Sequence, residues 1–195
     1  MNAADRAATA RARADTYRLL GRLCLAEVDA RLLAALRETA ELGPTLVGAD
    51  EPLLATLRAE YARLLLINVL PYESVFVDEQ VMLNTEATVA VYDAYREGGY
   101  SPAGQVGAPD HVGLELAFLG HLAADEAEAE AAGDAARAAR SRARQRSFLE
   151  AHLGRWAPVW ATALERAAEH PFYAALAAVV RDYVLAELEA ALERD

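Results

Sequence analysis

Apolar residues recur at three- and four-residue spacing through most of the chain, the pattern of helices that bury one face. The first helix is predicted from about Asp5 to Glu27. A second begins at Asp29, whose side chain suits a helix N-cap, and Gly43–Pro44 is expected to end it after Leu42. The pattern thus predicts two helices and a turn in the amino-terminal part of the chain.

The same spacing continues through the middle of the chain. A third helix carries Pro52 in its first turn and is predicted to end at Pro71, because proline disfavours helical geometry in the residue before it. Either Asn84 or Thr85 can cap a fourth helix, which the Gly98–Gly99 pair ends.

The carboxyl-terminal half is marked by similar signals. Asp110 is predicted to cap a fifth helix, and a sixth follows the Gly133–Asp134 break. Pro158 is expected to interrupt or restart the sixth, and Pro171 opens the last. The alanines and alternating charges of residues 123–143 predict a solvated helical hairpin, and a peptide-facing or self-association surface is the alternative. The expected fold is all-α, a single domain over residues 1–195 with about seven to eight helices.

Composition narrows the class of partner. The 30 acidic residues outnumber the 19 basic ones, which are all arginine, and the formal net charge is −11. Such a chain repels the phosphate backbone of nucleic acids on average, so no nucleic-acid partner is expected, and a cationic partner is favoured.

Targeting signals are not apparent in the sequence. The single cysteine, Cys24, lies among leucines, which excludes an internal disulfide and predicts a small buried side chain. The N-terminal region has neither an apolar signal core nor an adjacent arginine pair. The longest aliphatic run, Leu64–Leu70, is far shorter than the roughly 20 residues that span a bilayer. A cytoplasmic protein without membrane insertion is expected.

One group of candidate residues stands at the start of the fifth helix. His111 and Glu115 are four positions apart on one helical face, beside Asp110. They could form a hydrogen-bonded pair, a cation-binding acidic edge or half of a metal site. The other histidines lack zinc-ligand spacing, so no metal is expected. A purely structural role, with Asp110 as the cap and His111 bonded to a loop carbonyl, is left open.

A second group follows the third helix, in Pro71–Phe76. Tyr72 and Phe76 offer aromatic surface, and Glu73 with the nearby Asp78 supplies carboxylates. Because a guanidinium group can stack on a ring while it pairs with a carboxylate, this combination suits an arginine-bearing peptide. The alternative is a loop whose aromatic side chains complete the core.

Several segments, taken in order, resemble one known family. They are Tyr61–Leu65, Pro71–Phe76, Pro109–His111 with Glu115–Leu119, Phe148 with His152–Leu153, Trp156 and Pro158, and Phe172–Tyr173. Their order and spacing resemble the TorD/DmsD/NarJ family of redox-enzyme maturation chaperones over most of the chain. The Pro-Asp-His helix start is the most specific of these features.

The resemblance implies a TorD-like fold and a cytoplasmic chaperone that has no cofactor and catalyses no reaction. Its implied partner is the catalytic subunit of a molybdopterin oxidoreductase, whose N-terminal twin-arginine signal it binds while it assists folding and cofactor insertion before export or assembly. The resemblance places signal recognition on Asp110 and His111, and it places Tyr61, Tyr72, Ser74, Phe76 and Asp78 along the adjoining groove. Peptide selectivity does not carry over, because Glu79 stands where some relatives have a basic residue.

Other functions fit the sequence less well. An acid/base enzyme using His111 with Glu115 or Asp110 would lack a nucleophile, and nucleotide binding would lack a phosphate-binding loop. The alternative to the chaperone is a helical scaffold or dimerisation module. Monomer and homodimer both stay open, and the loops around Gly43 and Gly98 could act as hinges for helix exchange.

Overall fold

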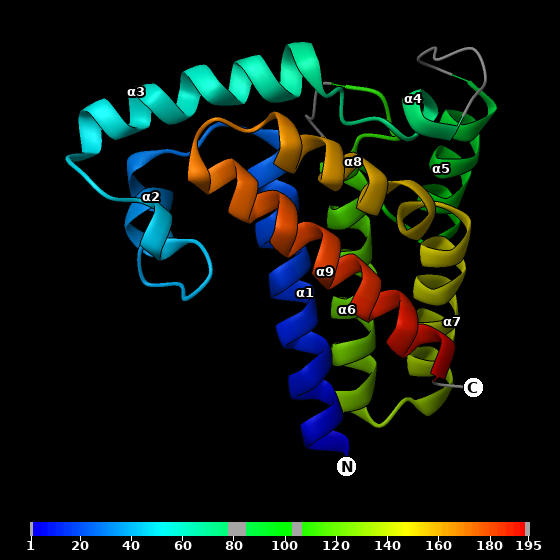
Figure 1. Cartoon of the computed structure of the whole chain (residues 1–195). Coiled ribbons are helices and arrows are strands. Elements are labelled where there is room, and N and C mark those ends of the chain that lie inside the picture. The colour runs from blue at the N-terminus through cyan, green and yellow to red at the C-terminus, as the bar shows by residue number, and fades with distance from the viewer. Residues whose placement is uncertain (1, 78–84, 103–106, 194–195) are drawn as a thin grey trace.

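The computed structural model describes residues 2–77, 85–102 and 107–193 and has the predicted all-α architecture (Figure 1). The predictions that concern Asp78, Glu79 and Asn84 lie outside these residues. The α-helices of the described part are α1 (Ala3–Leu25), α2 (Ala30–Leu36), α3 (Asp50–Tyr61), α4 (Glu73–Val77), α5 (Glu86–Glu97), α6 (Val112–Ala132), α7 (Ala135–Ala151), α8 (Leu153–Ala167) and α9 (Pro171–Glu193). A 3-10 turn, η1 (Gly43–Thr45), and a π-helical segment, η2 (Ala62–Asn68), complete them.

The antiparallel helices α1 and α6 form the centre of the bundle and make its most extensive contact (Figure 1). Glycines permit their close approach. A Cβ on Gly21 would lie 2.8 Å from the carbonyl oxygen of Gly113, and a Cβ on Gly113 would lie 2.5 Å from Leu25 Cγ. Helix α9 crosses in front of this pair, and α7 returns beside α6 (Figure 1).

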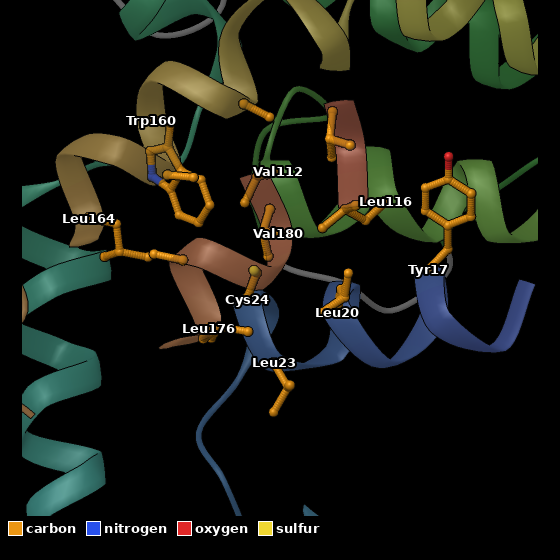
Figure 2. Close-up of a cluster of buried hydrophobic side chains, with 14 of the residues drawn as sticks. Tyr17, Leu20, Leu23, Cys24, Val112, Leu116, Trp160, Leu164, Leu176 and Val180 are labelled. Carbon is orange, nitrogen blue, oxygen red and sulfur yellow. The ribbon is translucent and has the colours of Figure 1, made fainter. Parts of the chain in front are cut away.

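The core lies where α1, α6, α8 and α9 converge. Figure 2 shows side chains from all four helices in one apolar cluster, among them Leu20, Leu116, Trp160 and Val180. Cys24 is fully buried in this cluster, as predicted, and burial raises the pKa of its thiol to about 12. The thiol is therefore protonated at neutral pH and packs as an apolar group.

The second helix is shorter than predicted. Helix α2 begins after the Asp29 cap but ends at Leu36, and η1 contains Pro44. Two features fold the following chain back on itself: Leu42 and Leu46 are both buried, and the Arg37 side chain donates to the carbonyl of Leu46 at 3.1 Å. Burying both leucines thus favours a sequence of turns over a continued helix.

The helix break in the carboxyl-terminal half also differs from the prediction. It lies at His152, with φ −127° and ψ −101°, whereas Pro158 stands inside α8. The ring of His152 is bonded to Glu73, a contact between distant parts of the chain that spacing alone does not reveal.

The hairpin of α6 and α7 is confirmed, but its inner face is not solvated. Gly133 makes the turn with φ +72°, in the left-handed region that favours glycine. Glu126 and Glu130 are buried, and both accept hydrogen bonds from Arg142. The alternating charges therefore form an internal ion network. Within the described part of the chain, no helix is long and apolar enough to cross a membrane.

Candidate functional site

The two segments singled out from the sequence lie against each other. The amide of Val112 donates to the carbonyl of Pro71 at 2.8 Å, and the amide of Glu73 donates to the carbonyl of Asp110 at 2.9 Å. Tyr72 and His111 form an isolated antiparallel bridge between them. Backbone pairing therefore fixes the start of α4 beside the start of α6.

Asp110 does not cap α6, contrary to the prediction; His111 does. The Nδ1 atom of His111 accepts from the amide of Gly113 at 3.0 Å, while Asp110 Oδ2 accepts from the amide of Ser74 at 3.0 Å. Asp110 thus stabilises the first turn of α4, although it lies 36 residues further along the chain than Ser74. Burial lowers the pKa of His111 to about 4, so its ring is neutral at pH 7, as an accepting Nδ1 requires.

Two further carboxyl groups are buried next to Asp110. Glu73 is 2% exposed and lies 3.0 Å from Nδ1 of His152. Glu115 is fully buried, and its Oε2 accepts from the indole Nε1 of Trp156 at 3.2 Å. Burial and then the nearby Glu73 carboxylate raise the pKa of Glu115, which favours the protonated form. We call Glu73, Asp110 and Glu115 the acidic cluster.

The acidic cluster differs from the other buried carboxylates of the described chain in having no arginine partner. Four other glutamates are buried, and each forms an ion pair with arginine: Glu60, Glu126, Glu130 and Glu187. In the cluster, Asp110 Oδ1 and Glu115 Oε1 have no hydrogen-bond partner, and neither has the neighbouring Ser74 Oγ. Buried polar atoms without partners are rare in folded proteins. The fold therefore leaves hydrogen-bonding capacity of these side chains unused here.

Aromatic rings surround the acidic cluster. Tyr72 packs edge-on against His111 with ring centroids 5.1 Å apart, and Phe76 lies 5.7 Å from Trp156. Tyr72 and Phe76 are partly exposed. The predicted site residues that the structure describes thus come together, except that Tyr61 is buried and its hydroxyl donates to the carbonyl of Cys24 at 3.3 Å. Asp78 lies outside the described residues.

Sequence reasoning did not include His152 and Trp156 among the site residues. Both come from the α7–α8 region and bond to the acidic cluster, His152 to Glu73 and Trp156 to Glu115. The only signal in the sequence was their place in the segments that resemble the chaperone family. Among the described residues, no three His, Cys, Asp or Glu side chains form a group that could hold a metal ion.

Replacing Glu115 by Gln should change how stability depends on pH. The raised pKa means that the folded state keeps a proton that the unfolded chain releases above pH 4.5, so this group makes the wild type less stable as pH rises. The stability of Glu115→Gln relative to wild type should therefore increase above that pH, by up to about 1.4 kcal/mol per pH unit. Urea unfolding at a series of pH values measures the difference.

Between its folded pKa of about 4 and its ordinary pKa of 6.5, His111 makes the protein more stable as pH rises. His111 is present in both wild type and Glu115→Gln, so its contribution to stability cancels when the two are compared. The matched control is Glu51→Gln, at an exposed position in the first turn of α3. Parallel stability curves for wild type and Glu115→Gln would contradict a protonated Glu115.

Comparison with known proteins agrees with the fold. A crystal structure of a candidate redox enzyme maturation protein from Archaeoglobus fulgidus superposes with a TM-score of 0.59 at 20% sequence identity, over 88% of this chain and 93% of that one. No curated protein matches the sequence.

A family model shows the relationship more directly. The model described as nitrate reductase delta subunit matches residues 25–162, a span that contains both segments of the candidate site. The chain therefore belongs to the nitrate reductase delta subunit family, NarJ/TorD-like proteins that act as maturation chaperones for molybdoenzymes and are not catalysts.

Proposed function

We propose that this cytoplasmic chaperone binds the N-terminal twin-arginine signal region of a molybdopterin oxidoreductase catalytic subunit, and assists its folding and cofactor insertion before export or assembly. The observation that carries the proposal is the acidic cluster, whose carboxyl groups lack the arginine partner that other buried acids of the described chain possess. An arginine side chain from another polypeptide is the complementary group.

The partly exposed rings of Tyr72 and Phe76 supply the place where a peptide arginine docks. Its guanidinium stacks on these rings and is attracted by the neighbouring carboxylates of Asp110 and Glu73. Because those carboxylates are buried, solvent screens their charge less than it screens surface charge. Apolar residues of the signal pack on the neighbouring surface and add to the affinity.

Calorimetric titration with the client's signal peptide tests this proposal. The Asp110→Asn variant removes charge but keeps an oxygen that can accept from the amide of Ser74. We expect its affinity for the peptide to fall at least about tenfold, equivalent to 1.4 kcal/mol. A peptide with both arginines replaced by alanine should not bind measurably.

The matched control is Asp15→Asn, which removes the same charge at an exposed position on α1. Its affinity should stay within about twofold of wild type, since an exposed distant charge is largely screened. Thermal unfolding must show that Asp110→Asn is folded. Equal affinities of wild type and folded Asp110→Asn, or equal binding of the alanine peptide, would refute the proposal.

A further inference from the structure

Glu115 is the member of the acidic cluster to which the proposed function gives no part. It is fully buried in the first turn of α6, where its Oε2 atom accepts from the indole of Trp156 and its Oε1 atom has no partner. Asp110 Oδ1 and Ser74 Oγ are buried and without partners as well. Because buried polar atoms are seldom left unpaired, these three oxygens indicate that a donor from outside the described chain completes the site.

The groups that face Glu115 include no arginine among the described residues. They are Glu73 on α4, Tyr95 on α5, Trp156 on α8 and Asp110 before α6, with His111 next to Asp110 and His152 bonded to Glu73. Burial raises the pKa of Tyr95 well above its usual value, so its hydroxyl is neutral, and burial keeps His111 neutral too. Glu115 therefore lies next to two other carboxyl groups with no compensating cation, and these surroundings favour a proton on it.

We propose that Glu115 binds an arginine of the client's signal directly and that the guanidinium takes the place of the Glu115 proton. On binding, the O–H bond of the carboxyl group breaks, the proton passes to the solvent, and the carboxylate pairs with the guanidinium. One positive charge replaces another, so the net charge of the occupied site equals that of the empty one. The exchange rests on the proposed function, since it takes place only where an arginine of the client binds.

The free oxygens suit a guanidinium group. Asp110 Oδ2 accepts from the amide of Ser74 at 3.0 Å, and Asp110 is close enough to Glu115 for their charges to interact. A guanidinium has five N–H donors in one plane and no acceptor, so it can bond to several neighbouring oxygens at once. The partly exposed ring of Phe76 packs against Trp156, which bonds to Glu115. The approach from the surface to Glu115 therefore leads past Phe76.

The exchange makes the affinity for the peptide depend on pH. A site that loses a proton on binding gains affinity as pH rises, by up to about tenfold per pH unit, until the free protein has lost the same proton. His111 does not contribute near neutral pH, because burial lowers its pKa to about 4. His152 is present in wild type and in every variant below, so its own titration cancels in their comparison.

Calorimetric titration with the client's twin-arginine signal peptide, blocked at both termini, counts the protons. At about pH 6, in buffers that differ in ionisation enthalpy, wild type should release about one proton per bound peptide. The Glu115→Gln variant keeps an acceptor for Trp156 but has no proton to lose, so it should release none and its affinity should not vary with pH. At about pH 8, wild type should bind at least about tenfold more tightly than this variant.

The matched control is Glu51→Gln, the same substitution at an exposed position of α3, which should release as many protons as wild type. Thermal unfolding must show that Glu115→Gln is folded. Infrared difference spectroscopy of wild type gives a second measurement, in which the C=O band of a protonated carboxyl group should disappear when the peptide binds.

The outcomes separate the exchange from the proposed function. Peptide binding without proton release, equal release by wild type and folded Glu115→Gln, or a carboxyl band that the peptide leaves unchanged would overturn the exchange and leave the proposed function intact. A wild type that does not bind the peptide at any pH would overturn the proposed function, and the exchange with it.

Discussion

The Arg13→Met variant is expected to lose about 3–5 kcal/mol of stability, because it leaves buried Glu187 with no arginine partner among the described residues and leaves buried Glu126 with Arg142 alone. Arg13 links α1 to α9 and α6: its guanidinium lies 2.6 Å from Glu187 and 3.0 Å from Glu126, and it also donates to Gln145 at 2.6 Å. Methionine retains an apolar chain like the stem of arginine but has no hydrogen-bond donors. Urea unfolding followed by circular dichroism at pH 7 measures the loss.

The matched control is Arg18→Met on the same helix. Arg18 is exposed and lies 3.4 Å from the exposed Asp15, so its loss should cost less than about 1 kcal/mol. Equal losses for the two variants would show that burial does not govern the strength of these ion pairs.

The Gly21→Ala variant should also destabilise the protein, by about 1–3 kcal/mol, although alanine favours helices. The added Cβ would lie 2.8 Å from the carbonyl oxygen of Gly113 and 3.3 Å from the amide nitrogen of Ala117. Both atoms belong to the backbone of α6, so relief requires α1 and α6 to separate. Urea unfolding again measures the change.

The reverse substitution at an exposed position of α1, Ala8→Gly, isolates the helix-propensity effect. It should cost about 1 kcal/mol, the amount that Gly21→Ala would gain if the helices were not in close contact. A stabilised Gly21→Ala variant would contradict close packing of the helices at this glycine.

Local signals predicted the helices well where a side chain acts on its own segment. Asp29 caps α2, Gly98 ends α5 and Pro171 opens α9, as expected from capping and proline preferences. Errors occurred where distant contacts decide the conformation. The helix break lies at His152 because its ring reaches Glu73, and Pro158 is accommodated inside α8.

In the candidate site, too, the sequence predicted some features and distant contacts decided others. The resemblance indicated Asp110 and His111, and the structure places them beside Glu73 and Glu115. The resemblance could not show that Asp110 accepts a hydrogen bond from α4. An aspartate just before a helix more commonly caps that helix, so the sequence indicated this role instead. Nor could it show which carboxylates lack arginine partners. A sequence does not show which acidic side chains are buried next to an arginine and which are buried without one.

The sequence by itself determined the all-α class, the order of the helices and the family, because hydrophobic spacing, capping residues and motif order are local or linear properties. Tertiary structure alone decided which charges are compensated. Glu126, Glu130 and Glu187 meet arginines from other helices, whereas the acidic cluster meets none among the described residues. The physical reason is that burial and ion pairing depend on contacts between residues far apart in the chain, and these contacts form only when the helices pack.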